Sequence, residues 1–282
     1  MIGNSEKVSC AGVVDRAAKL IRAAGRRVYS DAATAKLANL RAVVCADPAA
    51  LARSVDLLLV FGGDGTMLRV AREIAGSRTP ILGINIGGLG FLTAVPSAEL
   101  PRALKQVWEG AFRFESRALI QATGQCNERM VAHRALNDIV ISRGIASRLI
   151  ELTVRVDGEP LTRYRCDGLI VSSPTGSTAY ALAAGGAVLF PTAAVLALTP
   201  ICPHTLSNRS LIVPLTSTIE VTVNSPRPAT ILSADGQVVS ELTTGDVITI
   251  QRSRRVVCLM HLAGGSFFQT LRRKLHWRGA TV

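Results

Sequence analysis

The sequence of 282 residues predicts two architectures in one chain: an α/β unit with a parallel, Rossmann-like sheet, and a β-rich unit that resembles a β-sandwich. In the first hundred residues, continuous apolar runs alternate with helical patterns, as in parallel sheets flanked by helices. From about residue 117, alternating and β-branched runs indicate further strands. A helical pattern at 266–277 carries Phe267, Leu271 and Leu275 on one face, so we expect this helix to return to the first unit. The expected units are residues 1–100 with 266–282, and residues 101–265.

The first unit is predicted from its apolar runs and their breaks. The run at 55–61 is apolar apart from Asp56, and the run at 80–86 is as hydrophobic, as expected for strands buried on both faces. Gly25 is placed to end a helix. Residues 51–55 are expected to be a link. Strands are predicted at 8–14, 27–29, 43–44, 55–61 and 80–86, and helices at 17–24, 32–40, after residue 65, and at 97–110.

The second unit is predicted as a series of strands. Asp157-Gly158 is typical of a hairpin turn between two of them. The stretch 178–201 is hydrophobic enough to resemble a membrane span, but Gly185, Gly186, Pro191 and Pro200 divide it into short pieces, so we expect buried core. Strands are predicted at 117–123, 130–143, 149–157, 161–172, 211–223, 229–233, 247–252 and 256–262.

Composition restricts the classes of partner. The chain has 32 Lys and Arg against 20 Asp and Glu, a net charge of +12, which suits a polyanionic substrate such as a nucleotide. The basic residues are scattered without interleaved aromatics, so we expect neither a nucleic-acid nor a membrane partner. The six cysteines form no Cys-x-x-Cys pair, which argues against a zinc site or disulfide framework. No signal-peptide pattern begins the chain, and a cytoplasmic location is expected.

The stretch 60–69 is the central motif of the first unit. Gly62, Gly63 and Gly65 follow a buried strand and precede a helix, so backbone N–H groups can face an anion there. Asp64 lies among these glycines. Because a carboxylate repels phosphate, Asp64 is expected to act on something other than the phosphate. The alternative is a turn that is rich in glycine for its geometry alone.

The string Gly62-Gly63-Asp64-Gly65-Thr66 resembles the phosphate-donor motif of the superfamily that contains NAD kinases, diacylglycerol-type lipid kinases and 6-phosphofructokinases. It is not the P-loop, whose Gly-x-x-x-x-Gly-Lys-Ser/Thr pattern does not occur in the chain. This motif by itself leaves the acceptor of the phosphoryl group open.

Further stretches resemble NAD kinases specifically. In 135–141 the pair Asn137-Asp138 corresponds to an Asn-acidic pair that holds hydroxyls and the amide of the dinucleotide; the family more often has Glu at the second position. In 167–180 the resemblance implies that Asp167 and the turn 178–183 contact the nucleotide, with Tyr180 offering its ring face. The segment Gly176 to Thr178 is expected to supply the N-cap of the following short helix.

The remaining resemblances are shorter. The stretch 200–209 matches a signature that we interpret as structural, with His204 as a hydrogen-bonded architectural residue rather than a base. In 233–237, Gln237 corresponds to a ligand contact. Arg148 and Arg165 fall where the family contacts the dinucleotide, although either could equally be an ordinary surface arginine. The family usually has Ser at the positions of Ala181 and Ala183, so one hydroxyl contact is expected to be missing.

The resemblance to the ATP-NAD kinase family implies an enzyme that phosphorylates the 2′-hydroxyl of the adenosine ribose of NAD with ATP-Mg²⁺ to give NADP. Asp64 is expected to orient that hydroxyl and accept its proton late in phosphoryl transfer. Polyphosphate stays open as a donor, and a homodimer or homotetramer is implied. No protein metal cage is expected. The residues expected to bind nucleotide are Gly62, Gly63, Gly65, Thr66, Arg69, Asn137, Asp138, Arg148, Arg165, Asp167, Thr178, Ala179, Tyr180, Ala181, Leu182, Ala183 and Gln237.

Three alternatives follow from the same residues. A lipid or sphingoid kinase of the same superfamily should carry an interfacial amphipathic segment, which the sequence lacks. A nucleic-acid-binding protein is suggested only by the net charge of +12. A catalytically inactive nucleotide sensor is disfavoured by the presence of Asp64.

Overall fold

A computed structural model describes residues 1–88, 90–93, 95–126, 129–144, 148–204, 209–225 and 230–277. The chain divides into two compact units, Met1–Ser116 with Val257–Val282, and Arg117–Val256. The divisions fall after residues 116 and 256, whereas the sequence places them after 100 and 265. The difference includes the helix Leu100–Trp108, whose Leu100 and Leu104 are buried in the core of the first unit.

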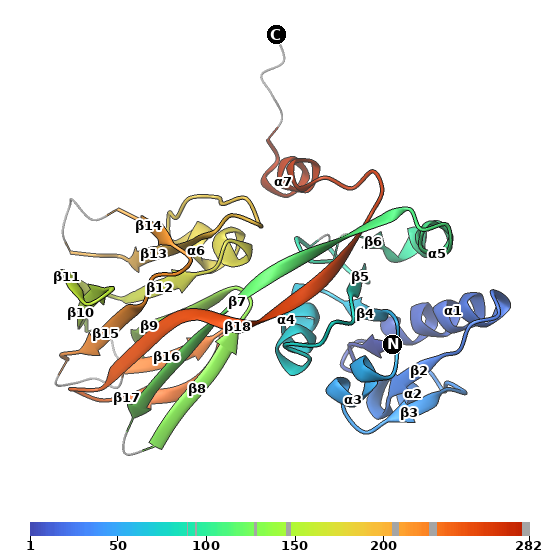
Figure 1. Ribbon diagram of the computed structural model, residues 1–282, viewed down its shortest axis with the longest axis horizontal. Coiled ribbons are helices and arrows are strands. Elements are labelled where there is room, and N and C mark those ends of the chain that lie inside the picture. Colours follow the sequence, from blue (N-terminus) through green and yellow to red (C-terminus); the bar gives the residue numbers. More distant parts are fainter. Residues whose placement is uncertain are drawn as a thin grey trace, which may run out of the picture. The chain divides into compact units, whose positions relative to one another are not determined.

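The first unit has the predicted α/β organisation (Figure 1). Strands β1, β4 and β5 pair in parallel, with Ile2 opposite Val60 and Leu58 opposite Ile81. All residues of β4 and β5 are buried, as the apolar runs predicted. The elements are β1 (Ile2–Gly3), α1 (Ser9–Ala23), β2 (Tyr29–Asp31), α2 (Ala32–Leu37), β3 (Val43–Cys45), α3 (Pro48–Arg53), β4 (Leu58–Gly62), α4 (Asp64–Glu73), β5 (Ile81–Asn85), β6 (Val95–Pro96), the 3₁₀ helix η1 (Ser97–Glu99), α5 (Leu100–Trp108) and α7 (Phe267–Leu275).

The register of β4 and β5 positions both glycine-rich segments. Gly62, the last residue of β4, lies opposite Asn85, the last residue of β5. The segments that follow, 63–65 and 87–90, therefore leave the same carboxyl edge of the sheet, where ligands of parallel sheets bind. The expectation that the segment from Gly62 to Gly65 joins a buried strand to a helix is confirmed, because it runs from the end of β4 into the start of α4.

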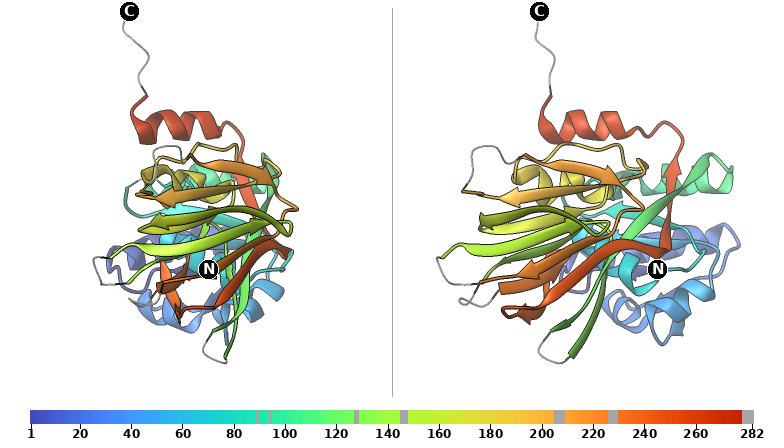
Figure 2. Two further views of the ribbon diagram at one scale, coloured as in Figure 1. Left: turned by 90° about the vertical axis from the view of Figure 1, so that its left-hand side faces the viewer. Right: turned by 60° about the vertical axis from the view of Figure 1, so that its left-hand side comes forward.

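The second unit is a β-sandwich (Figure 2). One layer has the order β18-β15-β10-β11, in which β15 pairs with the first half of β18. The other layer has the order β14-β13-β12-β9-β16-β17. Side chains from both layers, among them Leu152, Val154, Ile141 and Leu169, share one buried cluster. The elements are β7 (Phe112–Cys126), β8 (Arg129–Ala135), β9 (Asp138–Arg143), β10 (Ile150–Val156), β11 (Glu159–Cys166), β12 (Gly168–Ser172), the 3₁₀ helix η2 (Thr175–Thr178), α6 (Tyr180–Ala183), β13 (Val195–Ile201), β14 (Leu211–Pro214), β15 (Ile219–Val223), β16 (Thr230–Ala234), β17 (Gln237–Leu242) and β18 (Val247–Leu262).

Two local predictions are wrong. The run 8–14, predicted as a strand, is the first half of α1, because Cys10, Val14, Ala17, Ala18 and Ile21 recur with helical spacing and are buried on one face. The link predicted at 51–55 is the end of α3, whose N-cap Asp47 accepts a hydrogen bond from the N–H of Ala50 at 2.7 Å.

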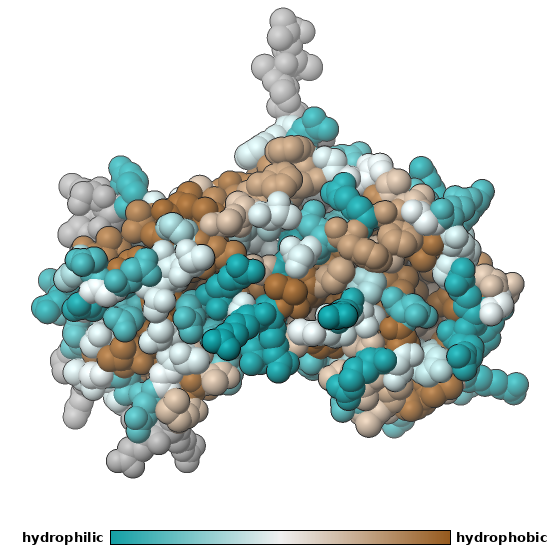
Figure 3. Space-filling view, viewed as in Figure 1, coloured by the Kyte–Doolittle hydropathy of each residue, from teal (hydrophilic) through white to brown (hydrophobic). Residues whose placement is uncertain are grey.

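Other elements are divided or joined differently from the prediction. The runs 130–143 and 161–172 each contain two strands, and the runs 247–252 and 256–262 are one strand, β18. The hydrophobic stretch 178–201 contains α6 and β13. Among the described residues, no helix is long and apolar enough to cross a membrane. The face drawn in Figure 3 shows hydrophilic side chains interspersed with hydrophobic ones.

The assignment of residues 8–14 to a helix can be tested with Gly12, which is exposed and has no atom within 4 Å of the place of a Cβ. We expect Gly12→Ala to raise the free energy of unfolding by about 0.5–1 kcal/mol, because alanine favours the helix and restricts the unfolded chain. The control is Gly25, which follows α1 and has a φ of +70°. Gly25→Ala should lower the free energy of unfolding by roughly 1 kcal/mol, because alanine disfavours positive φ. Urea unfolding measures both; a loss of stability in Gly12→Ala would contradict the helix.

Candidate functional site

Gly62, Gly63 and Gly65 differ in what surrounds them. A Cβ on Gly62 would lie 2.3 Å from Oγ1 of Thr66, so the first turn of α4 packs directly against the end of β4. Around Gly63 and Gly65, apart from their chain neighbours and the backbone of α4, no atom of the described residues lies within 4 Å of the place of a Cβ. Packing within the chain thus explains Gly62, whereas the backbone at Gly63 and Gly65 is open to an approaching molecule at the N-terminus of α4.

The Asp64 carboxylate binds residues 91–93, which follow the second glycine-rich segment. Its Oδ2 accepts a hydrogen bond from the N–H of Phe91 at 2.8 Å. Its Oδ1 accepts from the N–H groups of Leu92 at 3.0 Å and Thr93 at 3.2 Å, and from the Thr93 hydroxyl at 3.2 Å. The sequence does not predict this role, because the partners lie 27–29 residues away along the chain. The shared sheet edge was the one signal that could have suggested it.

Arg69 and Thr66 complete the first turns of α4. The guanidinium of Arg69 contacts Glu73, one turn further along the helix, with Nη1 to Oε2 at 3.0 Å. This half-exposed pair directs the Arg69 side chain along the helix. Thr66 is buried, and its contact with Gly62 makes it part of the packing of the motif.

In the second unit, three of the predicted motifs meet at residues 136–138. The carboxylate of Asp235 accepts hydrogen bonds from the backbone N–H groups of Asn137 at 2.7 Å, Leu136 at 3.1 Å and Asp138 at 3.4 Å. In this stretch the sequence pattern had pointed to Gln237 and not to Asp235. The signal available in the sequence was the pair Asp235-Gly236, which is typical of a turn. In the structure the φ of Asp235 in this turn is +47°.

The string 167–180 packs on the same residues. Ser173 donates its hydroxyl proton to the carbonyl of Leu136 at 2.5 Å, and its N–H to the carbonyl of Asn137 at 2.8 Å. A Cβ on Gly176 would lie 2.2 Å from the Asn137 carbonyl oxygen, so the turn 175–178 needs glycine to pack there. Nearby, the buried Arg117 donates from Nη1 to Oγ1 of Thr175 at 3.3 Å. Nothing in the sequence had distinguished Arg117.

The predicted N-cap role for residues 176–178 is wrong. The hydroxyl of Ser177 donates to the carbonyl of Pro174 at 2.7 Å and accepts from the N–H of Leu189 at 3.0 Å. Thr178 donates to the carbonyl of Thr175 at 3.4 Å. The N-cap residue of α6 is Ala179, which has no side-chain oxygen. Because these residues form the 3₁₀ helix η2, their hydroxyls bond backward along the chain.

Asp138 has an unusual environment. Its side chain is 4% exposed, and burial, together with the nearby Asp235 carboxylate, raises its pKa to about 7. Asn137, next to it, is half-buried. The pair thus presents an amide beside a carboxyl group that changes its charge near neutral pH, a combination suited to hydroxyl and amide ligands.

The other predicted residues vary in exposure. Asp167 forms an ion pair with Arg143, Oδ1 to Nε at 2.8 Å. Arg165 pairs with Glu151 on the neighbouring strand at 3.4 Å, with most of its side chain exposed. Ala181 is buried against Val140 and Ile170. Predicted residues with exposed side chains or backbone are Arg148, Tyr180, Ala183 and Gln237, and those of intermediate exposure are Thr178, Ala179 and Leu182.

The signature 200–209 is described in part. His204 is exposed, and its backbone N–H donates to the carbonyl of Arg165 at 2.9 Å. Residues 205–208, and Ala229 at the start of a predicted strand, lie outside the described residues.

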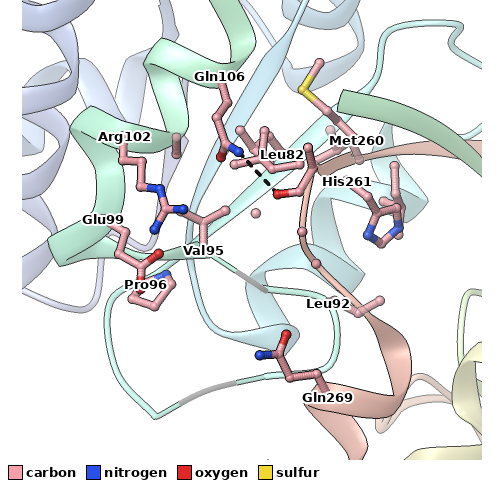
Figure 4. A pocket seen from close by; sticks show the side chains of 18 of the residues that line it. Leu82, Leu92, Val95, Pro96, Glu99, Arg102, Gln106, Met260, His261 and Gln269 are labelled. Atoms are coloured by element: carbon pink, nitrogen blue, oxygen red, sulfur yellow. Dashed lines mark hydrogen bonds between the residues drawn. The ribbon is translucent and has the colours of Figure 1, made fainter. Parts of the chain in front are cut away.

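Across the described part of the chain, no group of three or more His, Cys, Asp or Glu side chains could hold a metal ion. A cavity of about 380 Å³ in the first unit has Arg102, Glu99 and Gln269 along its wall (Figure 4). Leu92 borders this cavity, but none of the predicted site residues lines it. A second cavity of about 610 Å³ lies beside Trp108 and Arg26, at the opposite end of β4 from the glycines.

Comparisons with known proteins cover most of the chain. Residues 12–112 match the ATP-NAD kinase N-terminal domain, and residues 136–262 match the ATP-NAD kinase C-terminal domain. An NAD kinase of Moorella thermoacetica is 48% identical over 223 residues, which are 79% of this chain and 72% of the relative. An NAD kinase of Ralstonia nicotianae is 38% identical over 278 residues, 98% of this chain and 92% of the relative.

Two solved structures share the fold. Yeast NADH kinase complexed with NADH has a TM-score of 0.85 and 26% identity, covering 95% of this chain and 85% of the yeast chain. An NAD kinase from Archaeoglobus fulgidus in complex with ATP has a TM-score of 0.76 and 26% identity, covering 99% of this chain and 98% of the archaeal chain.

The environment of Asp138 predicts a pH dependence of stability. The native carboxyl group keeps its proton up to about pH 7, whereas in the unfolded chain it loses the proton near pH 4. The native state binds more protons in this window, so this group's contribution to stability falls as pH rises from about 4 to 7. Asp138→Asn removes the titration, and its free energy of unfolding relative to wild type should rise over this window, by at most about 1.4 kcal/mol per pH unit. Urea unfolding at several pH values tests this; parallel pH curves would contradict it.

Proposed function

Because the chain belongs to the ATP-NAD kinase family, we propose that it transfers the γ-phosphoryl group of ATP to the 2′-hydroxyl of the adenosine ribose of NAD, which gives NADP. Both family domains are matched in order along the chain. The relatives with the same fold were solved with NADH and with ATP, which are the acceptor type and the donor that the proposal requires. The family assignment decides against the lipid or sphingoid kinase.

The observation that carries the donor side is the open backbone at Gly63 and Gly65. These glycines lie at the N-terminus of α4, where free N–H groups and the helix dipole favour an anion, and the protein itself does not fill the space beside them. They would hold the triphosphate of ATP. Magnesium would arrive on the phosphates, where it neutralises charge, because the described residues offer it no cage.

On the acceptor side, the 2′-hydroxyl would meet the Asp64 carboxylate. A carboxylate is too weak a base to deprotonate a free alcohol, but it can orient the hydroxyl and take the proton as the oxygen–phosphorus bond forms. Among the described residues, three donors converge on Oδ1 and one on Oδ2, so Oδ2 is the oxygen that we expect to accept from the substrate. Asp64 thus combines two roles: it anchors the segment 91–93 and presents one oxygen to the substrate.

The dinucleotide would be held by the second unit. Asn137 and Asp138 would bind ribose hydroxyls and the amide group of the dinucleotide, and the exposed ring of Tyr180 offers an apolar face. Arg148 and Arg165 are exposed and suit phosphate groups, although Arg165 would have to exchange its pairing with Glu151. The remaining contacts would come from Asp167, the turn 178–183 and Gln237.

We also propose a cellular location, an oligomeric state and a second phosphate donor for the enzyme. Six free cysteines, three of them buried, suit the reducing environment of the cytoplasm. A homodimer or homotetramer and the use of polyphosphate as a second donor are inferred from the family resemblance. Light scattering during gel filtration tests the first, and NADP formation with polyphosphate in place of ATP tests the second.

The role of Asp64 is tested by Asp64→Asn. We expect NADP formation from NAD and ATP-Mg²⁺ to fall by about 100-fold or more, the order of effect of a general base. Thermal stability should fall as well, because the new NH₂ group faces backbone N–H donors in place of an acceptor. Activity is therefore measured at a temperature at which circular dichroism shows the variant folded. A folded variant within a few-fold of wild type would remove Asp64 from this role, and a wild-type protein without activity would overturn the function.

The donor site is tested by comparing glycines within one loop. The methyl groups of Gly63→Ala and Gly65→Ala meet no atom of the part of the chain that the structure describes, beyond their own neighbours and helix backbone, so stability should change by less than about 1 kcal/mol. The KM for ATP should rise by about tenfold or more. Gly62→Ala collides with Thr66 and should lose stability by about 1–3 kcal/mol. Steady-state kinetics with varied ATP and urea unfolding distinguish the two classes. An unchanged KM for ATP in the first two variants would place the triphosphate elsewhere.

A further inference from the structure

We propose that Asn85 and Thr93 are positioning residues that fix the orientation of the Asp64 carboxylate, so that Oδ1 stays bound to the protein and Oδ2 faces the acceptor hydroxyl. The inference rests on the proposed function. It comes from a chain of hydrogen bonds that joins the end of β5 to the first residue of α4, in which Asn85 and Thr93 are 4% and 0% exposed.

The chain begins with Asn85, whose amide orientation is determined by its partners. The N–H of Gly87 donates at 2.7 Å, so the atom facing it must be the oxygen Oδ1. The carbonyl of Gly88 accepts at 2.8 Å, so the atom facing it must be Nδ2. One proton of Nδ2 goes to Gly88, and the other is directed to the Thr93 hydroxyl oxygen at 2.8 Å.

The direction of the Thr93 hydroxyl follows from this. Because Nδ2 of Asn85 can only donate, the Thr93 oxygen accepts there and must place its own proton elsewhere. An ionised carboxylate can only accept, and Oδ1 of Asp64 lies 3.2 Å from the Thr93 oxygen. The hydroxyl proton therefore points at Oδ1. With the N–H groups of Leu92 and Thr93, Oδ1 then has three donors.

The packing around this chain leaves little room for adjustment. A Cβ on Gly90 would lie 2.0 Å from Oδ1 of Asp64 and 2.6 Å from Oγ1 of Thr93. A Cβ on Gly83 would lie 2.8 Å from the carbonyl oxygen of Leu92 and 3.1 Å from Cα of Thr93. The segment 90–93 is thus held between β5 and the carboxylate, and rotation of the carboxylate would break bonds on both oxygens.

A fixed carboxylate matters for the reaction because the oxygen that receives the proton must be aligned with the hydroxyl. In the transfer, the O–H bond of the 2′-hydroxyl breaks and its proton goes to Oδ2. The 2′-oxygen forms the new bond to the γ-phosphorus, and the bond from that phosphorus to the leaving oxygen of ADP breaks. Thr93 keeps its own proton throughout and touches no substrate atom.

The test compares Thr93→Val, Thr93→Ser and the control Thr34→Val. Thr34 is another fully buried threonine of the same unit, and its hydroxyl accepts from the N–H of Gly3 at 2.7 Å. We expect Thr93→Val to lower kcat by about tenfold or more, with KM values for NAD and ATP within about threefold of wild type. Its acidic limb in the pH profile of kcat/KM should move to higher pH, because a carboxylate that loses a donor becomes a stronger base. Thr93→Ser should keep kcat within about threefold, and Thr34→Val should move neither kcat nor the pH profile.

A double variant separates this inference from the proposed function. If Thr93 acts through Asp64, then Asp64→Asn combined with Thr93→Val should be no slower than Asp64→Asn alone. Multiplied effects, or a Thr93→Val enzyme whose kcat and pH profile match those of Thr34→Val, would overturn the positioning role while Asp64 keeps its own. An Asp64→Asn enzyme as active as wild type would overturn both. If Thr93→Val does not fold, Thr93→Ala combined with Asp64→Asn gives the same comparison.

Discussion

The interaction on which the first unit's site depends is the binding of one carboxylate by three successive backbone N–H groups. Asp64 begins α4, while Phe91, Leu92 and Thr93 follow β5, so the contact joins the loops that leave two neighbouring parallel strands. Both loops need glycine, because a Cβ on Gly62 would collide with Thr66 and a Cβ on Gly90 would collide with Asp64. The carboxylate supplies the missing acceptor for the second loop, and in return the loop fixes the direction of the carboxylate.

In the second unit, too, one carboxylate accepts hydrogen bonds from three successive backbone N–H groups. Asp235, in the turn between β16 and β17, accepts the N–H groups of Leu136, Asn137 and Asp138, and so holds the short segment between β8 and β9. The Ser173 hydroxyl donates to the carbonyl of Leu136 in this segment, and Gly176 packs against the backbone of Asn137. In both units a carboxylate from a distant part of the chain accepts hydrogen bonds from three successive backbone N–H groups of a loop. Asn137 and Asp138, two of the proposed substrate-binding residues, lie in the loop that Asp235 binds.

The charges of the two sites differ as their proposed tasks require. Around Gly63 and Gly65 the backbone is open and the helix dipole is positive, which suits a polyanionic donor. Around Asp138, burial and the carboxylate of Asp235 raise the pKa of the buried carboxyl to about 7, which suits neutral hydroxyl donors better than phosphates. A kinase needs both environments, because it must hold a highly charged donor beside an uncharged hydroxyl.

The sequence by itself determined the α/β and β-rich halves and the family to which the motifs belong. It also determined the two central strands, which were predicted at 55–61 and 80–86 and lie at 58–62 and 81–85. These features depend on local periodicity and short strings, which any part of a chain carries with it. Local patterns misjudged residues 8–14, because a short apolar run suits a helix or a strand until its packing face is known. Only the tertiary structure decided the partners of Asp64 and Asp235, which lie 27–29 and 97–99 residues away. Such bonds form between loops that neighbouring strands bring together, and no spacing in the sequence records which strands are neighbours.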